Sequence, residues 1–152
     1  MPDMLYSAQD LYAPGQLAID NLIATANWMM NELTKGLAPY QITLAQYKVL
    51  LYLYKQYPAH VTVSQIGENL IDRTPDVTRL LDRLEKQLWI LRKRAEHDKR
   101  IVEVHLTDSG RALVEAVQEP HDRIIDRLSG ILSNAEHLLL IDYLERLRRA
   151  PL

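Results

Sequence analysis

The feature that most constrains the fold is a sharply bounded helix that is followed at once by a short alternating hairpin. Thr74 is a typical helix N-cap, and Pro75 suits the first helical position, where its missing N–H costs nothing. Apolar residues then recur at helical spacing, at Val77, Leu80, Leu81 and Leu84. This succession predicts a winged helix-turn-helix, with a recognition helix over about residues 75–87 and a wing over about residues 89–106.

The hairpin is expected to join two short strands, over residues 89–94 and 101–106, through a polar tip. The second strand alternates plainly. Its apolar face carries Val102, Val104 and Leu106, while Glu103 and His105 share the other face. The fold class is therefore predicted to be mainly α with a small β-hairpin wing, in a single domain whose winged lobe spans residues 43–106.

Helix-type periodicity predominates elsewhere. A first helix is expected over residues 17–33, with Gly36 as its left-handed C-cap, and a second between Thr43 and Pro58. A short helix should follow a capping box at residues 62–65.

Two further helices are expected after the wing. Thr107 would cap the first of them, and Pro120 predicts a kink or a break within it. A capping box at residues 133–136 would open the last helix.

Composition excludes several classes of protein. No cysteine is present, which rules out disulfides, thiolate metal sites and thiol chemistry. No phosphate-binding glycine loop, zinc-protease motif or nucleophile elbow occurs, so we expect neither an enzyme nor a cofactor. No window approaches the ~20 apolar residues of a membrane helix, and no secretory signal is recognisable. We therefore expect a cytoplasmic protein without a membrane partner.

The net charge of −2 conceals a strongly uneven distribution. Residues 73–100 hold nine Lys and Arg against five acids, while residues 1–72 and 101–152 each sum to −3. The protein is thus basic only across the predicted recognition helix and wing, which is the electrostatic pattern of a local nucleic-acid contact.

On a helical wheel, polar residues line the face opposite the apolar one: Asp76, Thr78, Arg79, Asp82, Arg83 and Lys86. Arg and hydroxyl side chains in the first turns of such a helix are typical of entry into the DNA major groove. At the hairpin tip, the Asp98 carboxylate is placed to hold the Arg100 guanidinium extended toward a minor groove. A solvated charge run at a loop tip is the alternative.

The residues from about Thr43 to Gly110 resemble the MarR-type (multiple-antibiotic-resistance regulator) transcription factors. The matching pieces are Thr43-x-x-Gln46-Tyr47-x-Val49-Leu50, residues 74–85, Asp98-Lys99-Arg100 and Leu106-Thr107-Asp108-Ser109-Gly110. One departure is Leu88, at a position where the family usually has a left-handed glycine. Leucine in that conformation would cost ~1 kcal/mol or more, or the chain would turn differently.

The resemblance implies a homodimer that binds a pseudo-palindromic operator in double-stranded DNA. Helices from residues 1–36 and 107–152 would form the dimerisation region. We expect the dimer core to include Leu22, Met29, Leu139 and Leu144. The resemblance also implies repression that is released by a small phenolic or anionic ligand bound between this region and the winged lobe.

By the same resemblance, Arg100 would enter the minor groove with Asp98 as its partner. The recognition-helix candidates for DNA contact are Arg73, Thr74, Pro75, Asp76, Thr78, Arg79 and Arg83; the wing candidates are Arg94, Asp98, Lys99 and Arg100.

Two sets of residues carry weaker signals. Trp28, Tyr52 and Tyr57 are candidates to line a ligand pocket. For Met29 and Met30, which lie beside Trp28, the competing interpretation is that they fill the dimer core. The five histidines have no i, i+3 or i, i+4 pair, so no metal ligand is assigned; a metal role would require the fold to gather them with acids. The alternative function is a winged-helix module for protein interaction or dimerisation that does not read DNA.

Overall fold

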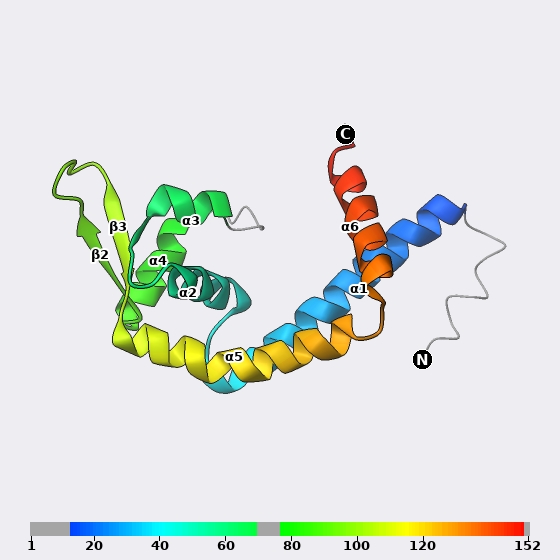
Figure 1. The fold of residues 1–152 in the computed structure, drawn as a ribbon, viewed down its shortest axis with the longest axis horizontal. Coiled ribbons are helices and arrows are strands. Elements are labelled where there is room, and N and C mark those ends of the chain that lie inside the picture. The colour runs from blue at the N-terminus through cyan, green and yellow to red at the C-terminus, as the bar shows by residue number, and fades with distance from the viewer. Residues whose placement is uncertain (1–12, 70–76, 151–152) are drawn as a thin grey trace.

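The computed structural model describes residues 13–69 and 77–150, and Figure 1 shows their arrangement. In chain order the elements are α1 (Pro14–Leu37), the 3₁₀ helix η2 (Ala38–Tyr40), α2 (Leu44–Gln56), β1 (Val61–Thr62), α3 (Val63–Asn69), α4 (Val77–Lys86), β2 (Ile90–Arg94), β3 (Val102–Leu106), α5 (Asp108–Ser129) and α6 (Asn134–Arg148). The fold is mainly helical with one small antiparallel sheet, as the sequence predicts. Within the described residues, no helix has both the length and the apolar character that crossing a membrane requires.

The elements from α2 to β3 form a winged lobe around one hydrophobic core. Most of the largest fully buried side chains come from α2, α3, α4 and the sheet, and α1 and α5 add Leu37, Val114 and Val117. Those of the lobe include Leu50, Leu53, Ile66, Leu81, Leu84, Ile90 and Val104. Local signals set the element boundaries. Thr43 forms a capping box with Gln46 at the start of α2, and Thr62 exchanges hydrogen bonds with Gln65 at the start of α3.

The sheet contains one strand more than the predicted hairpin. Its order is β1-β3-β2, so the two-residue strand β1 lies beside β3 on the side away from β2. β2 and β3 pair in the expected antiparallel register, with Arg92 opposite Val104. Val104 is fully buried, which confirms that the apolar face of β3 packs on the core.

Leu88 adopts the left-handed conformation, with φ of 60°, at the turn between α4 and β2. The hydroxyls of Thr107 and Ser109 donate to its carbonyl at 2.7 and 2.6 Å and hold the turn against the start of α5. A Cβ on Gly110 would lie 2.1 Å from the Trp89 carbonyl oxygen, so only glycine allows this close approach. The chain therefore makes the turn expected of glycine with a leucine in its place.

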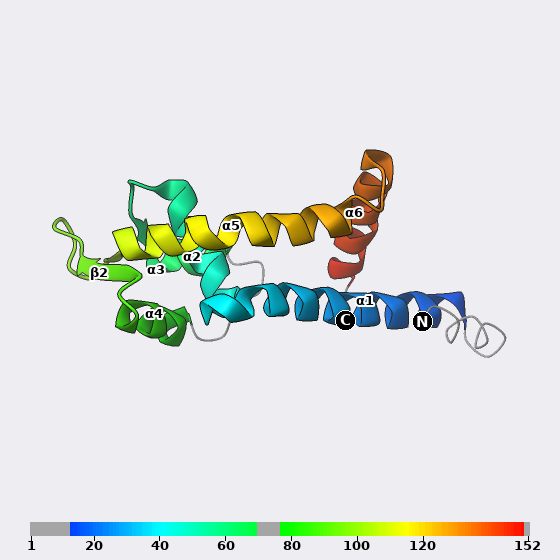
Figure 2. The same cartoon turned by 90° about the horizontal axis from the view of Figure 1, so that it is seen from below.

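Two long helices, α1 and α5, run side by side away from the lobe, and α6 crosses at their far end (Figures 1 and 2). The prediction that Gly36 ends the first helix as a left-handed C-cap is wrong. No described glycine has a positive φ, and α1 continues to Leu37. Gly36 instead permits close packing, because a Cβ there would meet Ile124 Cδ1 of α5 at 2.5 Å.

The predicted break at Pro120 is also absent, because α5 continues unbroken from Asp108 to Ser129. Proline lacks the N–H that would bond the carbonyl four residues earlier, which is that of Ala116. The Tyr40 hydroxyl donates to this carbonyl at 3.0 Å and takes the place of the missing donor. The expected caps of the C-terminal helices are present: Thr107 accepts from the amide of Gly110, and Ser133 forms a capping box with Glu136.

Candidate nucleic-acid interface

The helix α4 presents a charged face to the surface of the lobe. Leu80, Leu81 and Leu84 are buried, whereas Thr78, Arg79 and Arg83 are exposed, as the helical wheel predicts. The remaining recognition-helix candidates, Arg73, Thr74, Pro75 and Asp76, lie outside the described residues.

At the wing tip, the Asp98 carboxylate holds Arg100 with three hydrogen bonds. Oδ1 accepts from the Arg100 backbone N–H at 2.9 Å and from Nε at 3.2 Å, and Oδ2 accepts from Nη2 at 3.2 Å. These bonds hold the pKa of the Asp98 carboxyl below its usual range. The Arg100 side chain is 92% exposed, so the guanidinium is oriented and still accessible to a ligand.

The rest of the tip is closed by backbone contacts. Ala95 is fully buried, and its N–H donates to the Ile101 carbonyl at 3.0 Å. The Arg94 guanidinium donates to the Lys99 carbonyl at 3.3 Å. Arg94 therefore shapes the loop, while the side chain of Lys99 is exposed at its end.

Arg92 connects the wing to α4, a contact that the sequence does not predict. Its Nε donates to Glu85 Oε2 at 2.9 Å, and its Nη2 donates to Glu85 Oε2 and Asp82 Oδ1, both at 2.6 Å. The Arg92 backbone N–H also donates to Glu85 Oε1 at 3.1 Å. The bonds from Arg92 lower the pKa of Glu85, and those to Glu85 and Asp82 raise the pKa of Arg92.

This connection gathers opposite charges within the basic segment. Arg92 pairs with two of the five acids between residues 73 and 100, Asp82 and Glu85, so this cluster keeps one negative charge. The segment as a whole still carries an excess of basic side chains.

A cleft of about 440 Å³ lies between α3, α4 and the wing. Its lining includes the hydroxyl residues Thr62, Ser64 and Thr78 together with Arg92 and Arg100. Hydroxyl and guanidinium groups are common donors to DNA phosphates. The sequence analysis did not single out Thr62 or Ser64 as site residues, because only the fold places the start of α3 beside the wing.

The three candidate ligand-pocket residues lie on two helices, Trp28 within α1, Tyr52 within α2 and Tyr57 at the end of α2. Trp28 borders a cavity of about 300 Å³ between α1 and α5, together with Glu32, Arg123, Ile124, Arg127, Leu128 and Ile131. Tyr57 is exposed and its ring lies 5.6 Å from the Arg111 guanidinium, while Tyr52 packs partly buried against the lobe core.

Large apolar side chains are exposed along α1 and α6. They include Ile19, Ile23, Trp28, Met29, Met30, Leu138, Leu139, Leu140, Ile141 and Leu147. Of the predicted dimer-core residues, Met29 and Leu139 belong to this set, and Leu22 and Leu144 are partly buried. No residue of α6 is buried within the chain.

Comparisons with known proteins agree with this geometry. A family model described as transcriptional regulator SarA/Rot matches residues 33–117. The chain is 32% identical over 113 residues to the HTH-type transcriptional regulator PecS of Dickeya dadantii, an alignment covering 74% of this chain and 68% of PecS.

Two solved structures with DNA are similar to most of the chain. The S. aureus MepR–DNA complex superposes with a TM-score of 0.76 at 27% identity, covering 90% of this chain and 96% of MepR. A mutant MarR from E. coli complexed with operator DNA superposes with a TM-score of 0.72 at 30% identity, covering 86% of this chain and 93% of that protein.

Proposed function

Because the chain belongs to the MarR/SarA family of winged helix-turn-helix transcriptional regulators, we propose that it represses transcription as a ligand-responsive homodimer on a pseudo-palindromic operator. It is a DNA-binding regulator and not an enzyme. In this proposal Thr78 and Arg79 of α4 contact base edges in the major groove of DNA. Arg83, Arg94 and Lys99 contact the sugar-phosphate backbone of the DNA. Arg73, Thr74, Pro75 and Asp76 remain candidates by their place in the sequence.

The observation that carries the proposal is the preformed pair at the wing tip. An isolated, fully exposed arginine samples many rotamers, and ordering its side chain costs free energy on binding. Asp98 fixes the Arg100 guanidinium before DNA arrives, and a narrow minor groove attracts an inserted arginine. If residues 98–100 were only a solvated run of charges at a loop tip, the three hydrogen bonds between Asp98 and Arg100 would not be needed.

The exposed apolar faces of α1 and α6 support dimerisation. Contiguous apolar surface of this kind is uncommon on monomers and is typical of interfaces between subunits. A second copy of the chain would cover both helices at once and give α6 the core that it lacks within one protomer. The two recognition helices would then address half-sites ~34 Å apart.

A ligand response is supported by the cavity beside Trp28. An indole ring with the guanidinium groups of Arg123 and Arg127 suits a small aromatic anion. This cavity lies between α1 and α5, so a ligand can bind more tightly to one arrangement of these two helices than to another. Binding would then favour that arrangement and change the spacing of the two recognition helices in the dimer. The affinity of the dimer for the operator would change with that spacing.

The proposal is tested by footprinting the purified protein on DNA flanking its own gene, and by titrating the protected fragment between ~50 and 200 mM salt. We expect a palindromic footprint whose affinity falls steeply with salt, and release by an aromatic acid such as salicylate. A module that only binds proteins would give no footprint and no salt-dependent affinity.

Dimerisation is tested by sedimentation velocity of Leu139→Glu and Leu91→Glu. Leu139 is 54% exposed on α6 and Leu91 is 43% exposed on β2, so neither change removes a buried side chain. We expect Leu139→Glu alone to give monomers, because it places a charge in the proposed interface. Equal effects of the two changes would contradict the proposed interface.

A further inference from the structure

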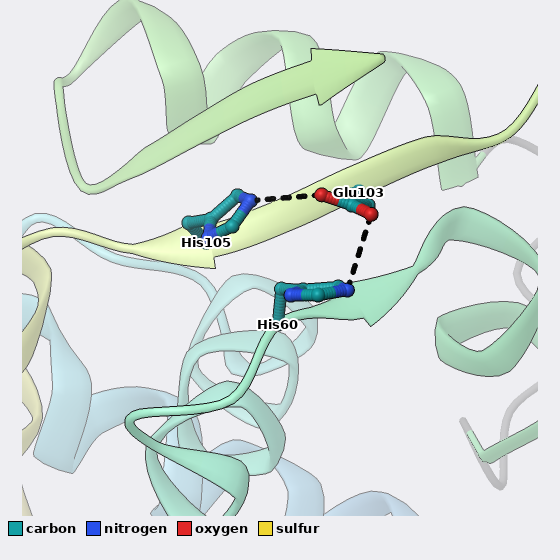
Figure 3. Close-up of side chains that lie close together, drawn as sticks. All are labelled: His60, Glu103 and His105. Carbon is teal, nitrogen blue, oxygen red and sulfur yellow. Dashed lines mark ion pairs between the residues drawn. The ribbon is translucent and has the colours of Figure 1, made fainter. Parts of the chain in front are cut away.

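Two of the five histidines, which are scattered in the sequence, meet on the outer face of the sheet. Thr62 pairs with Glu103 and Val61 with Val104, so His60 lies where it faces His105 at the end of the β1–β3 ladder. Glu103 and His105 are two apart on β3 and share the face opposite the buried Val104. Figure 3 shows the three side chains, with the Glu103 carboxylate joined to one ring nitrogen of each imidazole.

The carboxylate faces one ring nitrogen of each histidine. His60 Nε2 is 3.2 Å from Glu103 Oε1, and His105 Nε2 is 3.4 Å from Glu103 Oε2. The imidazole rings lie 5.0 Å apart between centroids. The ligand atoms of all three residues lie within 4.8 Å of one another.

His105 supplies a second observation. Its Nε2 is buried and has no hydrogen-bond partner in the described part of the chain, because its 3.4 Å contact with Glu103 lacks hydrogen-bond geometry. A buried ring nitrogen without a partner is costly in a folded protein. A metal ion would satisfy it, since neutral imidazole nitrogen is a common metal ligand.

We propose that His60, Glu103 and His105 form a binding site for a divalent transition-metal ion, with Zn²⁺ as the best fit. Bonds of about 2.1 Å to a tetrahedral ion place neighbouring ligand atoms ~3.4 Å apart. The two nitrogen–oxygen contacts, 3.2 and 3.4 Å, are of this size, and each reaches a different oxygen of the Glu103 carboxylate. Two imidazoles and one carboxylate leave the fourth position to water. Two nitrogen ligands disfavour Mg²⁺ and Ca²⁺, which prefer all-oxygen sites.

The bound ion would link β1 to β3. The chain between His60 and Glu103 contains α3, α4 and β2, which are the elements of the proposed DNA-reading surface. Closing this segment with a metal would restrict its unfolded conformations and stabilise the winged lobe. His60 is exposed just before β1, and Glu103 and His105 are partly exposed on β3, so an ion can reach the site without opening the core.

The test uses the untagged, full-length, metal-free protein. Titration calorimetry with ZnCl₂ should give one equivalent per chain, and Co²⁺ should give the visible absorption of a tetrahedral complex. The melting temperature should rise with free Zn²⁺, because the ion binds the folded state preferentially. Neither readout depends on DNA, so this result and the test of operator binding are independent.

His60→Ala and Glu103→Gln should each weaken Zn²⁺ binding at least tenfold and abolish the Co²⁺ spectrum. His97→Ala is the matched control, because His97 is an exposed histidine of the wing tip outside the cluster. Circular dichroism of each metal-free variant checks that the fold is retained. Unchanged Zn²⁺ affinity in His60→Ala, or an equal loss in His97→Ala, would overturn the proposed site.

Discussion

The hydroxyl of Tyr40 donates to the carbonyl of Ala116, at 3.0 Å, across the contact between η2 and α5. Ala116 is the residue whose helical hydrogen bond is removed by Pro120. A side chain 76 residues earlier in the chain therefore replaces a backbone donor and allows α5 to extend from the winged lobe to α6.

This relationship predicts an energetic coupling between Tyr40 and Pro120. Tyr40→Phe should destabilise the protein by ~1 kcal/mol, because the Ala116 carbonyl would lose its donor. In a Pro120→Ala background the same change should cost less, since the alanine N–H then bonds that carbonyl. Urea denaturation of the four proteins measures the coupling free energy. Identical costs in the two backgrounds would show that the Tyr40 hydroxyl does not replace the donor that Pro120 lacks.

Leu88→Gly should stabilise the protein. The leucine is left-handed and 72% exposed, so the change relieves backbone strain and removes little packing. The expected gain is ~1 kcal/mol, or a rise in melting temperature of about 2–4 °C. Leu88→Ala is the matched control, because alanine keeps the strain of the left-handed conformation. A gain from alanine equal to that from glycine would refute this account.

Arg100→Ala should weaken operator binding by ~1–3 kcal/mol without changing the oligomeric state. Asp98→Asn should cause a smaller loss, because it weakens the orientation of the guanidinium and leaves its charge in place. Arg149→Ala, at the end of α6, removes an exposed arginine far from the wing and should bind normally. Fluorescence anisotropy on the footprinted fragment gives the affinities. Normal binding by Arg100→Ala would exclude the minor-groove role.

Arg79→Ala should relax the sequence preference of the protein more than it lowers overall affinity. The side chain lies on the exposed face of α4 in the part that would approach base edges. Selection from a randomised operator library should show loss of preference at one symmetric pair of positions. A uniform fall in affinity across all sequences would identify Arg79 as a phosphate contact instead.

Stability should fall at high pH through Tyr47. Burial, with a contribution from the Asp122 carboxylate, raises the pKa of Tyr47 to about 12. The unfolded chain releases this proton near pH ~10, so the contribution to stability is complete below that pH and is lost as the pH rises toward 12. Tyr47→Phe should flatten the decline in melting temperature above pH ~10. If the melting temperature of Tyr47→Phe falls with pH as steeply as that of the unchanged protein, groups other than Tyr47 cause the loss of stability.

The winged lobe could be predicted from the sequence because its signals are local. The caps at Thr43, Thr62 and Thr107 depend on residues within three positions, and alternation in β3 identifies its buried face. The pair Asp98–Arg100 was predictable for the same reason, since only Lys99 separates the partners.

The features that escaped prediction depend on contacts between distant segments. Nothing in the sequence near Arg92 indicates that β2 places it beside Glu85, or near His60 that β1 pairs with β3. Gly36 was mistaken for a helix cap because its packing partner, Ile124, lies on another helix. A glycine after an apolar stripe is compatible with either role, and only the tertiary structure decides between them.

The connection through Arg92 divides α4 into two sets of residues. Asp82 and Glu85 bond Arg92 and fix the angle between α4 and the wing, while Thr78 faces outward and takes no part in those bonds. Under the proposed function, a substitution at Thr78 would alter the preference for an operator and leave the position of the wing relative to α4 unchanged.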